Sequence, residues 1–160
     1  MTRNVFRILL FFVCGIILGH FALRSAWPSF FKTETVMAQS SQPVLKLTRI
    51  YTGEDNQSHA EEVAVPFEQN SLRLLPVTGA EIHRGAAGSV TEWHPETQRM
   101  YVITLSGHGE IEVAGGKKIQ LVPGQMELVE DTRGKGHISR VTSTDDRVTM
   151  WLPLLDQTAH

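Results

Sequence analysis

The feature that most constrains the fold is a pair of strand-and-turn segments in the second half of the chain. Residues 93–113 have the pattern of a strand, a tight turn at Gly107-His108-Gly109 and a returning strand. Residues 123–137 supply a Pro-Gly turn, another strand and a glycine-rich bend that ends at His137. A closed β structure could bring His137 next to His94, far away in the sequence. We therefore expect a pocket with one histidine from each segment.

The rest of residues 39–160 also has the pattern of short strands and turns. Apolar and polar residues alternate over residues 44–52, and similar short segments recur as far as residues 147–154. Gly, Pro, Asn, Asp and Ser fill the gaps, and these are the residues that form turns. No segment after residue 39 has apolar residues at helical spacing. The pattern predicts one all-β domain, a sandwich or a barrel, over residues 39–160.

Residues 1–38 have the pattern of a targeting or anchoring segment. Residues 8–23 carry no formal charge and follow Arg3 and Arg7, as in an export signal or a membrane anchor. The apolar run is slightly short for a membrane span, yet the best cleavage site, at residues 36–38, lies unusually far from it. We expect an N-terminal hydrophobic helix, either a signal peptide or an uncleaved anchor. Both alternatives place the β domain outside the cytoplasm, secreted into the periplasm or held at the outer face of the inner membrane.

Charge and cysteine content exclude three classes of site in the β domain. Residues 39–160 contain sixteen acidic and eleven basic residues, a net charge of −5, without a cluster of Lys and Arg. Such a surface argues against nucleic-acid binding. The only cysteine, Cys14, lies in the apolar run, so the β domain has neither a thiol nucleophile nor a cysteine-ligated metal.

Residues 91–141 resemble the double motif of the cupin superfamily. Gly107 matches the glycine of the first motif, and Gly134-x-x-His137 matches the histidine of the second. The first motif is depleted, because only His94 remains of its usual histidine pair and Met100 stands at the position of its glutamate. Residues 47–62 and 128–137 also resemble small bacterial single-domain cupins, which mostly have no assigned activity. The resemblance implies a jelly-roll barrel, or double-stranded β-helix, and the homodimer that is common among cupins.

His94 and His137 are the candidate metal ligands. Neutral imidazole binds divalent ions such as Fe, Mn, Ni, Cu or Zn, and Glu96 or Gln98 could complete the site. Catalytic zinc sites usually have three protein ligands, and Pro95 leaves the direction of Glu96 open. The alternative is that both histidines line a polar cavity without a metal.

A ligand pocket is the second expectation. If Met100 faces the cavity, strand alternation places Val102 and Thr104 beside it. A mostly apolar lining with a few polar groups is typical of a pocket for a small organic ligand, with His94 and His137 as further ligand-binding residues. A packed barrel interior would have the same pattern, because Met also fills gaps in cores.

Two polar segments are candidates for the rim of this pocket. His59 and Glu62 follow an acidic turn after the first strand and could cover the pocket mouth. Arg133, Lys135 and the backbone amides of the glycine-rich bend could hold an anionic ligand. Each segment could equally be a solvated turn.

Two classes of function fit these observations. The first is an exported or membrane-tethered cupin-domain protein that binds a small organic ligand in its barrel. The second is a metal-dependent cupin enzyme, a dioxygenase, isomerase or lyase, in which His94 and His137 hold the metal. The depleted ligand set favours the first class, whereas one remaining histidine in each motif keeps the second open.

Overall fold

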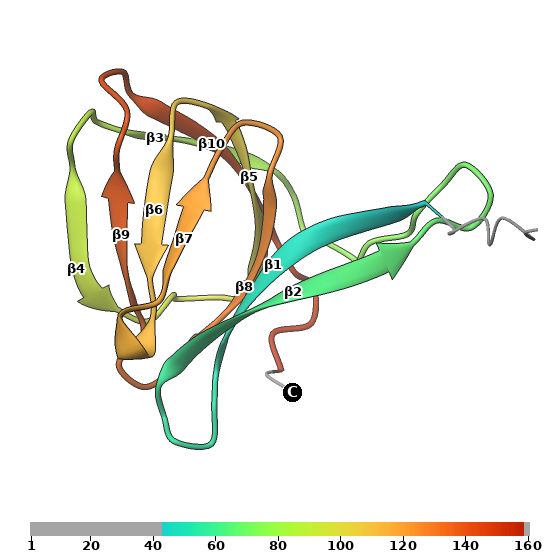
Figure 1. Ribbon diagram of the computed structural model, residues 1–160. Helices are drawn as coiled ribbons and strands as arrows, with labels where there is room; N and C mark the ends of the chain where they lie inside the picture. The colour runs from blue at the N-terminus through green and yellow to red at the C-terminus, as the bar shows by residue number, and fades with distance from the viewer. Residues whose placement is uncertain (1–42, 159–160) are drawn as a thin grey trace, which may run out of the picture. The chain divides into compact units, whose positions relative to one another are not determined.

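The computed structural model describes residues 43–158, in which nearly all regular structure is β-strand (Figure 1). The strands are β1 (Val44–Thr52), β2 (Ser58–Pro66), β3 (Glu81–Gly85), β4 (Val90–His94), β5 (Met100–Ser106), β6 (Gly109–Glu112), β7 (Lys118–Leu121), β8 (Met126–Glu130), β9 (His137–Val141) and β10 (Arg147–Pro153). One short 3-10 turn, Ala114–Gly116, precedes β7. The all-β prediction for the body of the chain is confirmed.

The expected N-terminal hydrophobic helix lies outside the described residues. Within residues 43–158, no helix is long and apolar enough to cross a membrane. The assignment of residues 1–38 to a signal or an anchor stays a prediction.

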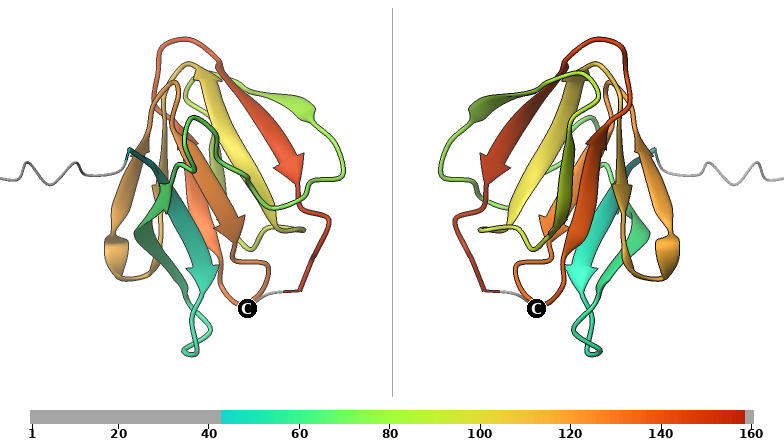
Figure 2. Two further views of the ribbon diagram at one scale, coloured as in Figure 1. Left: turned by 90° about the vertical axis from the view of Figure 1, so that its right-hand side faces the viewer. Right: turned by 90° about the vertical axis from the view of Figure 1, so that its left-hand side faces the viewer.

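The strands form two sheets that face each other (Figures 1 and 2). The larger sheet has the order β2-β1-β8-β5-β10-β3, and the smaller has the order β4-β9-β6-β7. Within these sheets, β1 and β8 pair in parallel and the other described pairs are antiparallel. The long β1–β2 hairpin extends beyond the rest of the larger sheet. The two sheets enclose a common interior.

Alternating side chains of β5 divide between two apolar clusters. Met100 and Val102 point into the interior, whereas Tyr101 packs with Leu47 and Leu154 on the other face of the larger sheet. The buried members of the interior cluster come from both sheets and are Ile50, Met100, Val102, Ile111, Val113, Leu121 and Val129. The predicted alternation along β5 is thus confirmed, since successive side chains of a strand point to opposite faces.

The turn at Gly107 does not close a hairpin, so that part of our expectation was wrong. β5 belongs to the larger sheet, and β6 belongs to the smaller one, where it pairs with β7 and β9. Gly107 has a φ of 73°, and a Cβ there would lie 2.7 Å from Cα of Arg147. Only glycine tolerates both conditions. The turn therefore passes the chain from one sheet to the other.

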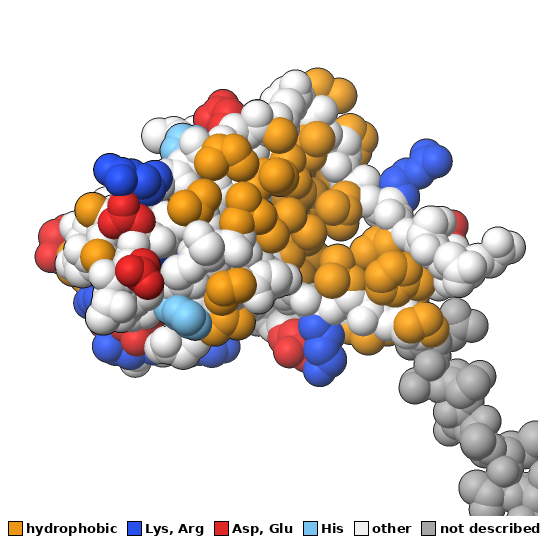
Figure 3. All heavy atoms as spheres, turned by 90° about the horizontal axis from the view of Figure 1, so that it is seen from above, with side chains coloured by type: hydrophobic (Ala, Val, Ile, Leu, Met, Phe, Trp, Pro, Cys, Tyr) orange, Lys and Arg blue, Asp and Glu red, His pale blue; other side chains and the backbone are white. Residues whose placement is uncertain are grey.

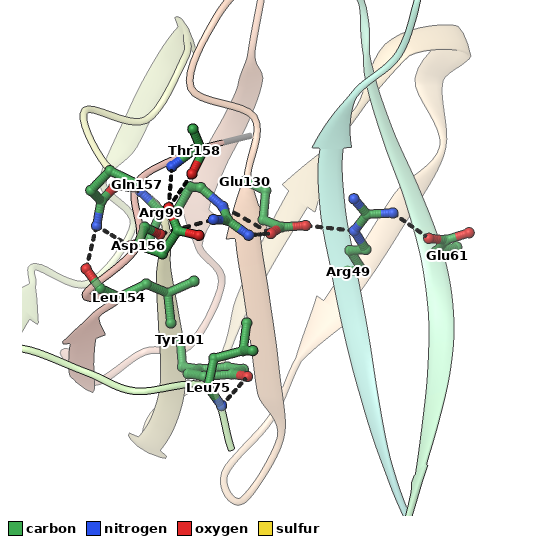
Figure 4. A network of polar contacts seen from close by, with 10 residues as sticks. All are labelled: Arg49, Glu61, Leu75, Arg99, Tyr101, Glu130, Leu154, Asp156, Gln157 and Thr158. Atoms are coloured by element: carbon green, nitrogen blue, oxygen red, sulfur yellow. Dashed lines mark hydrogen bonds and ion pairs between the residues drawn. The ribbon is translucent and has the colours of Figure 1, made fainter. Parts of the chain in front are cut away.

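A buried ion network joins β8 to two neighbouring parts of the chain (Figure 4). The carboxylate of Glu130 accepts hydrogen bonds from the guanidinium groups of Arg49 and Arg99. Arg99 also donates to the backbone carbonyl of Asp156 at 2.8 Å, and its backbone amide donates to the side chain of Gln157 at 2.7 Å. Burial acts to raise the pKa of Glu130, but the bonds from both arginines outweigh it and lower this pKa. The network fixes the chain immediately before β5 and immediately after β8.

Replacing Glu130 with glutamine will reduce the free energy of unfolding by about 3 kcal/mol or more, because the buried guanidinium of Arg99 loses its ion pair and Arg49 keeps Glu61 but loses one of its charged partners. Urea unfolding of the full-length protein measures this loss. The control is Glu62→Gln, whose carboxylate forms an ion pair with Lys46 on the surface, with side chains 63% and 64% exposed. We expect the control to lose less than about 1 kcal/mol. Equal losses in the two variants would contradict the structural role of Glu130.

Candidate functional site

His94 and His137 lie directly opposite each other on two paired strands. β4 ends at His94, β9 begins at His137, and the two residues are partners in the antiparallel register. Their ring centroids are 4.8 Å apart. The preceding residue, Gly136, has a φ of 70°, and a Cβ there would lie 1.8 Å from the carbonyl oxygen of His94. The glycine-rich bend therefore permits the close backbone approach that brings the histidines together.

Glu96 joins the two histidines although it lies beyond the end of β4. Its Oε1 atom is 3.8 Å from Nε2 of His94 and 3.8 Å from Nε2 of His137. The backbone amide of Glu96 donates a hydrogen bond to the carbonyl of Asp131 at 3.1 Å. This bond holds the chain after Pro95, so strand alternation does not decide where the Glu96 side chain lies.

Each histidine is oriented through its Nδ1 atom. Nδ1 of His94 is 2.7 Å from the carbonyl oxygen of Glu92, which can only accept, so this nitrogen carries the proton. Nδ1 of His137 is 2.7 Å from Oδ2 of the fully buried Asp131. In the neutral form of each imidazole, an Nδ1 atom that donates leaves the lone pair on Nε2. Metal-binding histidines show this arrangement, in which a carboxylate or carbonyl fixes the tautomer.

The three side chains fit a divalent metal. Their ligand atoms all lie within 4.8 Å of one another, and atoms bound to one ion at about 2.1 Å lie roughly 3 to 3.5 Å apart. A small contraction of the group would suffice. Burial raises the pKa of Glu96, and the histidines offset this shift only in part. A cation among these groups would stabilise the ionised carboxylate.

A cavity of about 220 Å³ lies between the sheets and includes this site in its wall. Glu96 and His137 contribute to its lining, as do Val102, Val129 and Ile111 from the interior cluster. The remaining lining residues are His83, Arg84, Gly85, Ser89, Thr91, Glu127, Ser139, Arg140, Val141, Arg147, Thr149 and Trp151. Most of the lining residues are thus polar or charged, and apolar side chains lie among them.

The other predicted pocket residues lie close to the cavity but not in its lining. Met100 is fully buried in the interior cluster. Thr104 is also fully buried, and its hydroxyl accepts a hydrogen bond from Nη2 of Arg147 at 2.6 Å. Gln98 is half-buried in the segment before β5. Of the two proposed third ligands, only Glu96 joins the group with His94 and His137.

The first pair of predicted rim residues lies outside the cavity lining. Nε2 of His59 is 2.9 Å from the carboxylate of Asp55 in an exposed pair at the start of β2. Glu62 forms its exposed ion pair with Lys46. Both residues therefore have partners on the β1–β2 hairpin.

The second pair lies on the glycine-rich bend. The side chain of Arg133 is exposed, and its carbonyl accepts a hydrogen bond from the hydroxyl of Thr52 at 3.0 Å. The ammonium group of Lys135 lies 3.7 Å from the ring centroid of Trp93, a cation–π contact. Neither residue lines the cavity.

Sequence reasoning missed a buried charged pair in the cavity wall. Glu127 is fully buried, and its Oε2 atom is 3.8 Å from Nη2 of Arg147. Burial raises the pKa of Glu127 to about 8, since the charge of Arg147 compensates only in part. The sequence did indicate that Glu127 points to the same face of its strand as the interior residue Val129, because the two residues are two positions apart. Parity alone does not show which face is buried.

Asp131 was also missed as a functional residue. Its Oδ2 atom accepts hydrogen bonds from Ser58 at 2.9 Å and from His137. The aspartate is fully buried. No local pattern in the sequence reveals such contacts between distant segments.

The strand arrangement identifies the architecture. Two facing sheets, a glycine turn that passes between them and a histidine pair on neighbouring strands of the smaller sheet form a double-stranded β-helix. The domain has a cupin fold. No protein-family model matches the sequence of this chain, and no curated protein sequence matches it significantly.

Solved structures similar to this domain include several cupins. A cupin protein from Bacteroides fragilis has 19% identity, with 78% of this chain and 86% of that chain covered and a TM-score of 0.36. An RmlC-like cupin protein from Desulfovibrio desulfuricans has 13% identity, coverage of 68% and 81%, and a TM-score of 0.35. Ectoine synthase from P. lautus has 26% identity, coverage of 54% and 64%, and a TM-score of 0.34. The strand arrangement, rather than these likenesses, establishes the fold.

Replacing Glu127 with glutamine will change how the stability of the protein depends on pH. The folded-state pKa of about 8 lies above the ordinary glutamate pKa of 4.5, so the folded protein retains a proton that the unfolded chain releases. The stability from this proton is complete below about pH 4.5 and is lost as the pH rises through about 8. Between about pH 5 and 9 the native protein should lose about 4 kcal/mol more than the variant. Urea unfolding at several pH values measures the difference.

Glu54→Gln serves as the control for this pH series, because Glu54 is exposed in the β1–β2 turn. It should follow the pH dependence of the native protein. A Glu127→Gln profile that also parallels the native one would show that Glu127 is ionised in the folded state.

Proposed function

We propose that this cupin domain binds a divalent metal through His94, Glu96 and His137, and a small organic ligand in the adjoining cavity. The observation that carries the proposal is the convergence of the two Nε2 atoms on one oxygen of Glu96, at 3.8 Å from each. Both Nδ1 atoms already have acceptors elsewhere. In the neutral form of the imidazoles, two lone pairs and a carboxylate oxygen face one another, and a cation at their centre would bind all three.

The types of donor atom restrict which metal ions this site would bind. Two imidazoles with one carboxylate suit Fe(II) with open positions, and the same donors bind Zn²⁺ in some hydrolases. Mn, Ni and Cu are the further candidates. When bound, such an ion supplies Lewis acidity toward a ligand oxygen, or redox chemistry if it is iron. Asp131 and the carbonyl of Glu92 keep the imidazole tautomers suited to ligation.

The cavity supports binding of a small molecule. Its walls combine the apolar side chains of Val102, Val129, Ile111 and Trp151 with many polar and charged groups, and ligand sites likewise join apolar surface to convergent polar groups. Its volume of about 220 Å³ corresponds to about seven water molecules at the density of the liquid. A ligand of this cavity is therefore smaller than a typical drug.

A metal-dependent enzyme is the second candidate function. Among dioxygenase, isomerase and lyase, the two-histidine, one-carboxylate set favours oxygen chemistry on iron. Oxygen consumption by the iron-loaded protein, with small carboxylic acids as trial substrates, tests this candidate separately from metal binding.

An extracytoplasmic location is also part of the proposal. It is supported by the uncharged run of residues 8–23 after Arg3 and Arg7, which fits export or tethering to the membrane. Fractionation of cells that produce the full-length protein would test it, since cytoplasmic recovery would contradict it.

We also propose that the protein forms a homodimer, in which its partner is a second copy of the chain. Figure 3 shows hydrophobic side chains gathered over a broad area of one face of the domain. Large exposed apolar residues include Ile82 and Leu155, at 62% and 66% exposure. Extended apolar surface of this kind is typical of interaction sites, and sedimentation analysis of the full-length protein would reveal the oligomeric state.

The full-length protein will bind about one equivalent of a divalent metal, and His94→Ala, His137→Ala and Glu96→Gln will abolish stoichiometric binding. Asp131→Asn should weaken affinity by about 10- to 100-fold, because it disturbs the orientation of a ligand rather than removing one. Isothermal titration with Zn²⁺ and Co²⁺, together with elemental analysis after loading with Fe, Mn, Ni or Cu, measures these effects. His59→Ala is the control, since His59 lies in the exposed pair with Asp55. Absence of binding for every metal, or equal loss in the control, would refute the metal site.

A further inference from the structure

A second polar cluster lies in the cavity wall, separate from the candidate metal ligands. Glu127 on β8 and Arg147 on β10 line the cavity, and Thr104 on β5, outside the lining, accepts a hydrogen bond from Arg147. Glu127, Val129 and Asp131 alternate along the same face of the chain, and extended backbone rises about 3.3 Å per residue. The Cα atoms of Glu127 and Asp131 are therefore roughly 13 Å apart if this geometry continues. One cavity thus has polar groups toward two ends.

The cluster contains buried polar atoms that lack hydrogen-bond partners. Among residues 43–158, neither carboxyl oxygen of Glu127 has a hydrogen-bond partner, and Nε of Arg147 has none either. The side chain of Glu127 is only 1% exposed, yet it lines the cavity. Buried polar groups without hydrogen bonds are costly, so such groups usually face a bound molecule or ordered water.

The local backbone is shaped to admit the arginine. A Cβ on Gly109 would lie 3.0 Å from Cδ of Arg147, and a Cβ on Gly107 would lie even closer to its backbone. The register of β5 and β10 shifts between Val148 and Thr149, and such bulges redirect side chains next to functional sites. The hydroxyl of Thr104 then holds Nη2 of the guanidinium. The two glycines, the register shift and the Thr104 hydroxyl therefore all contribute to the inward position of the Arg147 side chain.

We propose that Glu127 and Arg147 bind the carboxylate end of a small organic acid in the cavity. This inference rests on the proposed function in one respect only, that the cavity holds a ligand. The Nε–H group of Arg147 donates to one carboxylate oxygen, and the carboxyl group of Glu127, in its neutral form, donates to the acid as well. Arginine suits planar carboxylates because its N–H groups match their geometry.

The protonation of Glu127 supports this assignment. Burial raises its pKa to about 8, so near neutral pH the side chain is a hydrogen-bond donor rather than a second anion. The cluster then has the positive charge of Arg147 without a compensating carboxylate. Val102, Ile111 and Val129 line the cavity, which suits an acid with a short apolar chain.

The test is isothermal titration of the full-length protein, freed of metal by a chelator, with butyrate and succinate at about neutral pH. Removal of metal prevents carboxylates from binding as metal ligands. We expect both acids to bind at least about tenfold more tightly than butyramide and succinamide, because hydrogen bonds to charged groups discriminate by at least this factor. Equal affinity for acids and amides, no binding at millimolar concentration, or tighter binding of inorganic phosphate would overturn the proposal.

Substitutions in the cluster of Glu127, Arg147 and Thr104 test whether the acid binds there. Arg147→Met should weaken butyrate binding at least about tenfold, whereas Glu127→Gln, which keeps a neutral donor, should change it little. Arg84→Met is the control, because Arg84 also lines the cavity but is 72% exposed and paired with Asp146. If Arg147→Met does not fold, the nearly isosteric Thr104→Val decides, since loss of the hydroxyl should still weaken binding. Unchanged affinity in the folded variants would place the acid elsewhere.

His94→Ala separates this inference from the proposed metal site. The variant should lose metal binding but retain butyrate binding. Butyrate binding by a protein that binds no metal would refute only the metal site. Metal binding without binding of any acid would refute only the carboxylate cluster.

Discussion

The hydrogen bond between buried Asp131 and His137 is the interaction on which the candidate site depends. It fixes the imidazole tautomer and points Nε2 toward Glu96, while the backbone carbonyl of Asp131 holds the amide of Glu96. A single residue thus positions a ligand from β9 and another from the segment after β4. The bonds of Glu130 to Arg49 and Arg99 fix the chain next to Asp131. The site is consequently tied to the ion network around Glu130 in the larger sheet.

Two different kinds of buried polar group line the cavity. Near the smaller sheet, two imidazoles and a carboxylate offer lone pairs and negative charge, which attract a cation. On the larger sheet, Arg147 and the carboxyl group of Glu127 offer donors and positive charge, which attract an anion. A molecule with one carboxylate and one metal-binding oxygen would satisfy both. Such complementarity explains why the barrel retains buried polar groups that would otherwise reduce its stability.

Much of the fold followed from local sequence patterns, whereas the site followed only in part. The alternation of apolar and polar residues predicted strand β1 and which side chains of β5 point to each face of the sheet. The cupin-like spacing predicted that His94 and His137 would lie next to each other. The local sequence does not show which sheet a strand joins, so we expected the strands on either side of Gly107 to pair with each other, whereas they belong to different sheets. Glu96 was an open alternative because its direction depends on a hydrogen bond to Asp131, a residue distant in sequence. Glu127 and Arg147 were missed because charged residues on strands are usually exposed.

The most direct test of this account is a crystal structure of the metal-loaded protein, with the ion located by its anomalous scattering. The account predicts one ion bound by Nε2 of His94, Nε2 of His137 and Oε1 of Glu96, at about 2.0 to 2.2 Å from each atom. The Nδ1 contacts to Asp131 and to the carbonyl of Glu92 should remain. An ion bound elsewhere in the domain, or histidines that turn their Nδ1 atoms toward it, would contradict the account.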